Sequence, residues 1–246
     1  MTLGGFQKLT LIDYPGHIAT TVFTVGCSFR CPFCHNPELV DLRLTHNSES
    51  EKNFFAFLKT RQGKLDGVCI TGGEPTIQPD IVEFIRKIKK MGFAVKLDSN
   101  GTRPDVLKRL IDQKLVDYIA MDIKSDLKNY DKLTGSKVPA STRGDNRSST
   151  RGWDKDRIKL SVDLIMHSRV PYEFRTTVVP GLHKEKDFLE IAKWISGARE
   201  YWLQEYREDF KILDQSLKKK TKGKKLDLEK IKKSIEKSFG KVGIRR

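Results

Sequence analysis

Short apolar runs alternate with amphipathic segments along most of the chain. Six runs rich in β-branched and aromatic side chains predict strands at residues 18–25, 67–71, 94–97, 118–123, 172–179 and 201–204. Apolar side chains at helical spacing predict helices between them, at residues 51–61, 79–91, 104–113, 157–167 and 184–194. Alternating strands and helices predict βαβ units, a parallel sheet and right-handed crossovers. Six units are too few for a full eight-unit barrel, so the pattern predicts an α/β fold, an incomplete (β/α)6 TIM-like barrel.

Two segments interrupt this rhythm. Residues 135–153 are rich in Gly, Ser, Thr and Arg and have almost no apolar side chains, which predicts a mobile loop. Residues 217–225 are mostly lysine and predict a solvated basic linker, so we expect a main domain at 1–216 and a tail at 217–246. One face of a short helix ending at Gly240 then gathers Leu226, Leu228, Ile231, Ile235 and Phe239. We expect this helix to pack against the barrel, with docking to a partner as the alternative.

Length and charge narrow the class of protein. A chain of 246 residues fits one domain, and no run approaches the roughly 20 apolar residues of a membrane span. The N-terminus lacks the layout of a signal peptide, so free thiols indicate a reducing cytoplasm. The net charge of +15 favours acidic protein faces, nucleotides or nucleic acid, although a Lys/Glu-rich solvated surface explains it better. No aromatic-studded basic patch accompanies the charge, so neither a nucleic-acid partner nor a membrane is expected.

Three of the four cysteines form one C-x3-C-x2-C loop directly after the first predicted strand, at Cys27, Cys31 and Cys34. Thiolates suit iron–sulfur clusters, zinc or copper(I). Three thiolates on one loop can hold three corners of a cubane iron–sulfur cluster and leave the fourth iron open. An open coordination position is what chemistry requires, whereas closed sites are structural or carry electrons.

Four other interpretations of the cysteines compete with an open cluster. A structural zinc site needs four ligands, and His35, next to Cys34, is poorly placed as the fourth. A disulfide leaves odd cysteines, and a C-x-x-C-H haem attachment at residues 31–35 leaves Cys27 unexplained. Chance clustering of core cysteines is the last alternative, and three cysteines within eight positions disfavour it. Cys69 lies apart from the loop, inside a predicted buried strand, and is interpreted as a small hydrophobic residue.

With an aromatic residue, Phe33, before its last cysteine, the loop resembles that of the radical S-adenosylmethionine (SAM) superfamily. Two segments, C-H-N-P-E-L at 34–39 and L-T-L-I-D-Y-P-G at 9–16, resemble activases of glycyl radical enzymes, nearest to those of anaerobic ribonucleoside-triphosphate reductase. The resemblance runs from about residue 4 to 204 and implies a partial barrel open on one side. It also implies a [4Fe–4S] cluster on the three cysteines, SAM as cosubstrate, anaerobic ribonucleotide reductase as the partner glycyl radical enzyme, and a flavodoxin or ferredoxin as reductant.

Further candidate residues lie at the ends of predicted strands, where parallel barrels place their ligands. Gly72, Gly73 and Glu74 form a glycine-rich turn where backbone can approach a ligand, and the resemblance implies that they meet the amino group of SAM. The resemblance also implies a monovalent cation beside the cosubstrate, and oxygen ligands suit such an ion. Its ligands would be Asp98, Ser99, Asp122 and the carbonyl of Ala120.

Several of these residues have plain alternatives. The resemblance also places Asp98 beside the cosubstrate. Aspartate is common in turns and at helix caps, which gives Asp98 and Asp122 an alternative explanation. The resemblance implies that Lys124 and Arg175 lie near the SAM carboxylate. Arg175 is a charge inside an apolar run and needs an anionic partner, so an internal salt bridge is its alternative.

The sequence gives less support to the remaining candidates for a binding site. Phe33 and Val179 are expected to flank adenine, with ordinary core packing as the alternative, and Gln204 ends the sixth predicted strand. Asp13 and Tyr14 precede the first predicted strand and are expected to line the entry route of the partner, or to be turn residues.

The resemblance implies reductive cleavage of SAM, followed by removal of a hydrogen atom from a backbone glycine of a partner enzyme. Two other functions stay open. One is a radical enzyme acting on a small molecule or nucleotide, such as 7-carboxy-7-deazaguanine synthase. The other is a non-catalytic metal protein that binds nucleic acid through its basic tail. Release of 5′-deoxyadenosine separates the enzymes from the binding protein.

Overall fold

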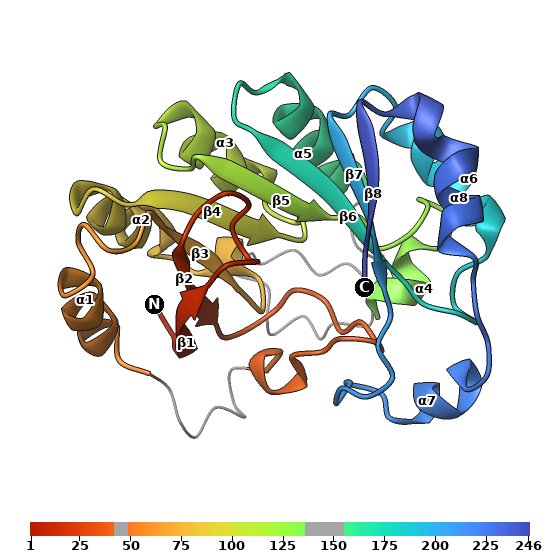
Figure 1. Ribbon diagram of the computed structural model, residues 1–246, viewed down its shortest axis with the longest axis horizontal. Helices are drawn as coiled ribbons and strands as arrows, with labels where there is room; N and C mark the ends of the chain where they lie inside the picture. Colours follow the sequence, from red (N-terminus) through yellow and green to blue (C-terminus); the bar gives the residue numbers. More distant parts are fainter. Residues whose placement is uncertain (42–48, 136–154) are drawn as a thin grey trace, which may run out of the picture.

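A single eight-stranded sheet organises the computed structural model, which describes residues 1–41, 49–135 and 155–246 (Figure 1). The strands lie side by side in sequence order. The first pair is antiparallel and every later pair is parallel. The strands are β1 (Leu3–Thr10), β2 (Ala19–Thr24), β3 (Gly67–Gly72), β4 (Ala94–Ser99), β5 (Tyr118–Asp122), β6 (Tyr172–Val178), β7 (Glu200–Glu205) and β8 (Lys241–Arg245).

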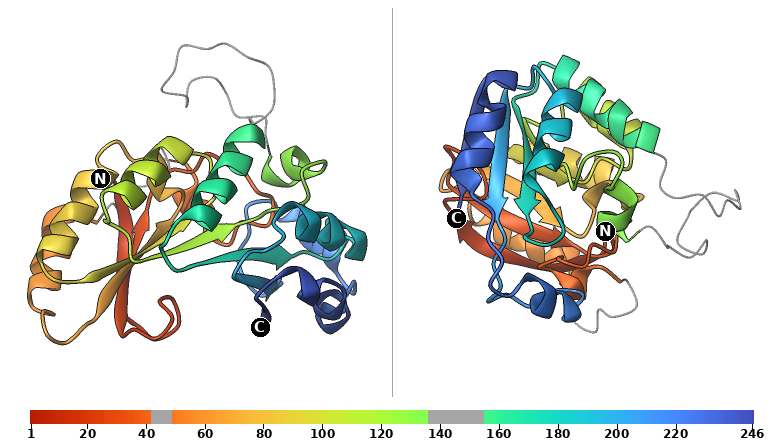
Figure 2. Two further views of the ribbon diagram at one scale, coloured as in Figure 1. Left: turned by 90° about the horizontal axis from the view of Figure 1, so that it is seen from above. Right: turned by 90° about the vertical axis from the view of Figure 1, so that its right-hand side faces the viewer.

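Helices cover the outer face of this curved sheet (Figure 2). These covering helices are α1 (Glu51–Lys59), α2 (Ile81–Lys90), α3 (Pro104–Asp112), α5 (Lys155–His167), α6 (Glu185–Trp194) and α8 (Leu228–Ile235). Two shorter helices, α4 (Tyr130–Thr134) and α7 (Ser216–Thr221), lie away from this face, in the connections that follow β5 and β7 (Figure 1). Short 3-10 helices lie at η1 (Pro37–Leu39), η3 (Pro75–Ile77) and η5 (Glu236–Ser238). No helix in the described part of the chain is long and apolar enough to cross a membrane.

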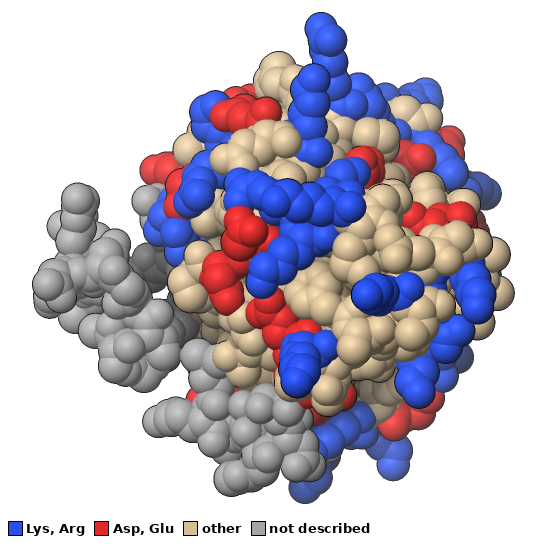
Figure 3. All heavy atoms as spheres, turned by 90° about the vertical axis from the view of Figure 1, so that its left-hand side faces the viewer, with Lys and Arg blue, Asp and Glu red and all other residues tan. Residues whose placement is uncertain are grey.

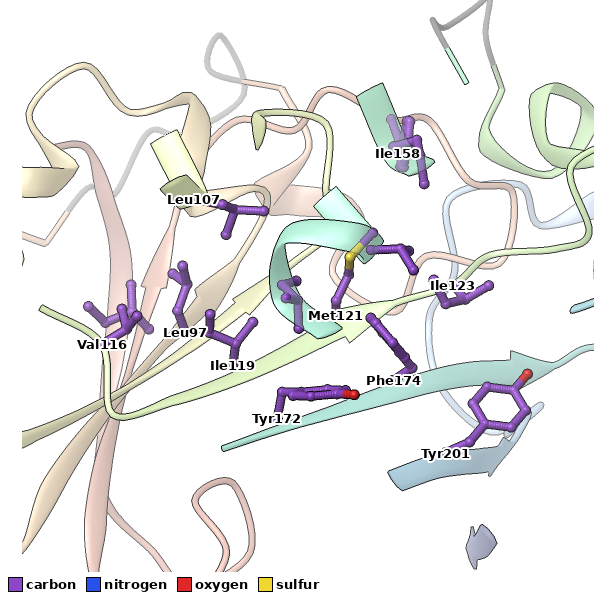
Figure 4. Packing of buried hydrophobic residues seen from close by; sticks show 14 of the residues in the cluster. Leu97, Leu107, Val116, Ile119, Met121, Ile123, Ile158, Tyr172, Phe174 and Tyr201 are labelled. Atoms are coloured by element: carbon purple, nitrogen blue, oxygen red, sulfur yellow. The ribbon is translucent and has the colours of Figure 1, made fainter. Parts of the chain in front are cut away.

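The hydrophobic core lies between the sheet and its helices. Leu97, Ile119 and Phe174 point from neighbouring strands toward Leu107 and Ile158 of the covering helices (Figure 4). Side chains alternate between the two faces of a strand, so the residues between these apolar positions face the inside of the partial barrel. Those inner positions carry charges, among them Lys96, Asp98, Asp122 and Arg175. The fold therefore separates an apolar outer layer from a charged interior.

All six predicted strands and all five predicted helices are present, and the partial barrel is confirmed. The sequence pattern missed the two edge strands. In β1 the middle residues are exposed and two are glycines, and β8 has only five residues with charged ends. At Gly243, an added Cβ would lie 2.2 Å from the Trp202 ring, so this strand depends on a contact that local sequence does not show.

The C-terminal segment also differs in content from its prediction. The expected helix is present as α8, but β8 follows it and pairs with β7 along five positions. The predicted linker contains the short helix α7. The division at residue 216 stays a prediction. Of the predicted mobile loop, residues 136–153 lie outside the described residues.

Candidate active site

The cysteine loop leaves the C-terminal end of β2 and is held by backbone hydrogen bonds on two sides. One set joins it to the last residue of η1 and the residue after it, and the other joins it to the segment that follows β7. The bonds are Gly26 N to Leu39 O at 2.7 Å, Cys27 N to Val40 O at 3.1 Å, Leu213 N to Cys34 O at 3.1 Å and Asp214 N to Pro32 O at 2.9 Å. Segments far apart in the chain thus set the path of this loop.

All three loop cysteines are free, with Cys31 buried and Cys27 and Cys34 partly buried. Burial raises the pKa of each thiol, while the nearby Lys124 ammonium opposes this rise in pKa at Cys31 and Cys34. A ligand that binds thiolates must therefore displace their protons. No group of three His, Cys, Asp or Glu side chains in the described ranges is arranged to hold one metal ion. A cubane cluster, in contrast, binds each thiolate at a separate iron.

Two N–H groups point at the sulfur of Cys27. The backbone N of Phe29 lies 3.4 Å from it and the side-chain Nδ2 of Asn100 lies 3.7 Å from it. Hydrogen bonds to ligand sulfurs stabilise their charged form and tune an iron–sulfur cluster. Three thiols on one loop, sulfur-directed donors and a nearby ammonium group fit a [4Fe–4S] cluster.

The Asn100 amide is held in one orientation, and sequence analysis did not identify this residue as part of the site. Its Oδ1 accepts hydrogen bonds from the backbone N of Thr102 at 3.1 Å and from its hydroxyl at 2.8 Å. The Nδ2 therefore faces the other way, toward Cys27 and the hydroxyl of Ser28 at 2.9 Å. Its place in the run Asp-Ser-Asn-Gly after β4 was the only available signal.

We expect Asn100→Ala to lower the midpoint potential of the bound cluster and to weaken cluster binding by about 10- to 100-fold. The reason is that the variant removes a positive N–H dipole from the Cys27 sulfur. Spectroelectrochemical titration and iron content measure the two effects. Ser28→Ala is the control, because it removes the other acceptor of the same amide and leaves the sulfur contact. An equal shift in both variants would contradict this role.

Glu74 connects the ends of β3 and β4 from a buried position, with 1% of its surface exposed. Its carboxylate accepts hydrogen bonds from the backbone N of Thr76 at 3.1 Å, the hydroxyl of Ser99 at 2.8 Å and the backbone N of Asn100 at 2.6 Å. Burial raises its pKa above the ordinary value, although these donors oppose the rise. The carboxylate is enclosed by the protein, which differs from the expected contact with SAM.

The two glycines before Glu74 allow close backbone packing, Gly72 against the end of β2 and Gly73 against the start of the cysteine loop. Gly72 has φ +108°, and an added Cβ would lie 2.5 Å from the backbone N of Thr24. At Gly73 an added Cβ would lie 2.0 Å from the carbonyl oxygen of Gly26. Contact of these glycines with the amino group of SAM stays a prediction, and the packing seen here is a second reason for glycine.

Gly73→Ala is expected to destabilise the protein by about 1–3 kcal/mol, because the new methyl group overlaps backbone that cannot move alone. It should also weaken SAM binding, since the displaced Gly26 begins the cysteine loop. Urea unfolding and calorimetric titration of the cluster-loaded protein with SAM measure the two effects. If the variant were as stable as the wild-type protein, the start of the cysteine loop would be able to shift without an energetic cost, which would contradict this prediction.

A ladder of alternating charges crosses the interior of the barrel. Arg175 lies at its centre, with Nε 2.7 Å from Asp122 Oδ1 and Nη2 2.9 Å from Asp98 Oδ2. Lys124 Nζ lies 3.0 Å from the other oxygen of Asp122, and buried Lys96 pairs with the other oxygen of Asp98. Burial by itself would raise the pKa of both carboxyls, but the adjacent cationic groups bring each pKa below its ordinary value.

The residues expected to bind a monovalent cation are engaged with protein groups in this ladder, and the cation site stays a prediction. All four carboxylate oxygens of Asp98 and Asp122 already contact cationic side chains. The Ser99 hydroxyl donates to Glu74, and Ala120 is fully buried. The protein supplies the positive charge itself, and the internal salt bridge considered for Arg175 is the arrangement observed.

Lys96 was missed because a lysine in a short strand is usually exposed, whereas here 2% of its side chain is exposed. The available signal was its spacing from Asp98, which places both side chains on one face of β4. A second missed pair joins β8 to β6, where Arg245 donates two hydrogen bonds of 2.7 and 2.6 Å to the buried Glu173.

Three further candidates lie where the sequence analysis placed them, and their contacts with a ligand stay predictions. Phe33 and Val179 are 4% and 0% exposed and belong to the hydrophobic core, which agrees with the packing alternative. Gln204 lies partly buried on β7 beside Thr177 and Arg245, and its role stays a prediction.

The loop before β2 lies at the N-terminal ends of the parallel strands, opposite to the cysteine loop. Tyr14 is 2% exposed, and its ring lies 6.1 Å from that of Tyr118, between ring centroids, at the start of β5. The Asp13 carboxylate accepts a hydrogen bond from the Thr21 hydroxyl. Tyr14 is thus inaccessible to a partner, contrary to the expected entry route, because it fills the closed end of the barrel.

The chain is similar to known proteins over most of its length. The model of the radical SAM superfamily matches residues 21–195. A protein of Methanocaldococcus jannaschii named as a putative glycyl-radical enzyme activating enzyme is 33% identical over 245 residues, which cover 99% of this chain and 95% of that protein. The pyruvate formate-lyase-activating enzyme of Clostridium pasteurianum is 26% identical over 241 residues, covering 90% of this chain and 93% of that enzyme.

Solved structures agree in fold. Streptococcus suis SuiB bound to S-adenosylmethionine superposes with a TM-score of 0.60 at 14% identity, covering 91% of this chain and 49% of that protein. The cysteine loop at the mouth of a partial barrel and the family match over most of the chain lead to one assignment. This chain belongs to the radical SAM superfamily, an enzyme family that uses a [4Fe–4S] cluster and S-adenosylmethionine.

Proposed function

We propose that this protein is an activase that cleaves SAM reductively and installs a glycyl radical on a partner enzyme. The observation that carries the proposal is the position of the three free thiols, on one loop at the C-terminal ends of the barrel strands. Similarity along nearly the whole chain to a named activating enzyme supports the same activity.

The chain's own residues bind and orient the reacting groups in this proposal. Cys27, Cys31 and Cys34 hold the cluster, which supplies one electron when bound. Asn100 donates to the sulfur of Cys27, and the Gly73 backbone supports the loop from the adjacent strand. Lys124, whose pKa is raised because the charge of Asp122 outweighs burial, presents a fixed ammonium group for the SAM carboxylate.

Anaerobic ribonucleoside-triphosphate reductase is the proposed partner. The segments at residues 9–16 and 34–39 support it, because they resemble activases of that enzyme. A flavodoxin or a ferredoxin is the proposed reductant. Four free cysteines agree with a reducing cytoplasm as the working compartment.

The test uses anaerobically reconstituted protein with SAM and photoreduced 5-deazaflavin. Release of 5′-deoxyadenosine, measured by chromatography, supports reductive cleavage, and its complete absence would overturn the proposal. Adding the reductase should then give a glycyl radical signal in electron paramagnetic resonance. A reductase with its radical glycine replaced by alanine is the control. Cleavage of SAM without a radical on any glycyl radical enzyme would instead indicate a small-molecule substrate.

A further inference from the structure

A compact basic surface lies on α7 and the turn after it. Residues 216–225 contain six lysines and no acidic residue, and we call these lysines the lysine patch: Lys218, Lys219, Lys220, Lys222, Lys224 and Lys225. Leu217 and Thr221 are buried at 2% and 0% exposure. The segment is therefore anchored to the protein and presents its lysines from a defined position, unlike a free linker.

The charge of the lysine patch is only partly compensated. Lys224 and Lys225 share a cavity of about 250 Å³ with Glu205 and Glu208. Lys219, Lys220 and Lys222 are exposed, and none has an ion pair with a described acidic residue. These three lysines therefore carry charge that no described ion pair neutralises, although the charge of Lys220 adds to the hydrogen bonds from Ser216 in lowering the pKa of the Asp214 carboxyl.

The opposite side of the molecule is different. Over α1 and α2, basic and acidic side chains are interspersed (Figure 3). Lys87 pairs there with Glu51 at 3.0 Å, and Lys89 pairs with Asp117 at 2.6 Å. Mixed charge of this kind is the ordinary state of a protein surface. The segment that carries the lysine patch contains no acidic residue and does not follow this pattern.

The lysine patch lies next to the cysteine loop. Leu213 and Asp214 donate backbone hydrogen bonds to Cys34 and Pro32, and α7 begins two residues later at Ser216 (Figure 1). Leu217 N bonds Asp214 O at 3.0 Å, which joins α7 to the same clamp. A protein that binds the lysine patch therefore lies beside the backbone that carries two of the three cysteines.

We propose that the lysine patch is the docking surface for a small acidic protein that delivers single electrons to the cluster. This rests on the proposed function, because each reductive cleavage consumes one electron that the chain's side chains cannot supply. The reduced flavin or iron–sulfur centre of the donor protein loses one electron and the cluster gains it. The electron then enters the breaking bond between the SAM sulfur and its 5′ carbon.

Charge complementarity suits this kind of partner. Electron-transfer complexes are small and short-lived, and opposite charges increase their association rates. Lysines without an ion pair to a described acidic residue, on a segment bonded to the cysteine loop, give the attraction and place the donor beside that loop. A glycyl radical enzyme must instead bring its glycine to the open mouth of the barrel, where SAM binds.

The test compares two triple variants with the same change in net charge. Lys219→Glu, Lys220→Glu and Lys222→Glu reverse the lysine patch. Lys52→Glu, Lys59→Glu and Lys64→Glu reverse exposed lysines in and after α1 as the control. Stopped-flow absorbance records reduction of the cluster by flavodoxin hydroquinone at low salt. We expect at least a 10-fold lower rate in the patch variant, less than a 2-fold change in the control, and a wild-type rate that falls as salt is added.

A second measurement separates docking from catalysis. Photoreduced 5-deazaflavin is a small reductant that needs no docking, so 5′-deoxyadenosine formation with it should be equal in all three proteins. If wild-type protein forms none, the proposed function fails, while the flavodoxin reduction rates still decide the docking proposal. Equal rates of reduction by flavodoxin in the patch variant and the control overturn the docking proposal. The docking proposal is also overturned if the patch variant is reduced by flavodoxin at the wild-type rate but no longer forms the glycyl radical when deazaflavin is the reductant. That result would assign the lysine patch to the glycyl radical enzyme.

Discussion

Cys31→Ala is expected to abolish both iron–sulfur binding and 5′-deoxyadenosine formation. Cys31 is the middle ligand of the motif and is 6% exposed. Only two thiolates would be left on the loop, and the adjacent His35 is directed away from it, toward Tyr206 and Phe210. Iron content, visible absorbance and deoxyadenosine release after anaerobic reconstitution measure the loss.

Cys69→Ala is the matched control for this prediction. Cys69 is a buried thiol inside β3, with its sulfur 3.8 Å from Lys96 Nζ and far along the sequence from the loop. Its removal should leave iron content and SAM cleavage at the wild-type level. Circular dichroism of both variants checks that each is folded. A Cys31→Ala protein that keeps its iron and cleaves SAM would contradict the three-cysteine assignment.

Arg175→Met is expected to destabilise the protein by about 3–5 kcal/mol at pH 7. The variant leaves the buried carboxylates of Asp98 and Asp122 without their shared partner, and breaking a buried ion pair from one side costs this much. Urea unfolding measures the change. Arg86→Met is the control, because Arg86 pairs with Glu83 at the exposed surface, where such pairs contribute less than about 1 kcal/mol.

The pH dependence gives this prediction a second signature. In the wild-type protein the pKa values of Asp98 and Asp122 are lowered, so their stabilising contribution is present above the unfolded pKa of about 3.9 and is lost as pH falls through the folded pKa. Without Arg175, burial should raise both pKa values. The deficit of the variant should then shrink as pH is lowered from 7 to 4, when these carboxyls gain protons. A deficit that is independent of pH would show that lost packing, not charge, causes it.

The alternation of strands and helices was visible in the sequence because it is a local property. Each strand of the barrel is a short apolar run, and each covering helix repeats its apolar positions within one or two turns. The cysteine loop was visible for the same reason, since its three sulfurs lie within eight positions. These features involve only neighbouring residues, so no knowledge of the fold is needed to find them.

The charged interior was only partly visible. Asp98 and Arg175 lie 77 residues apart, and only the strand register brings them together. The sequence analysis therefore placed candidate residues for a cation site at strand ends, but it did not identify their charged partners, Lys96 among them. The same holds for Tyr14, whose burial depends on strands that follow it in the chain.

The sequence by itself determined the fold class, the location of the cysteine ligands and the strand ends at which polar residues gather. Only the tertiary structure decided which charges neutralise each other, which glycines carry backbone contacts and which lysines stand beside the cysteine loop. The physical reason is the separation along the chain of the residues that each feature involves. Periodicity and ligand spacing act over a few residues, whereas ion pairs, close backbone approach and burial depend on the packing of segments that are distant in the chain.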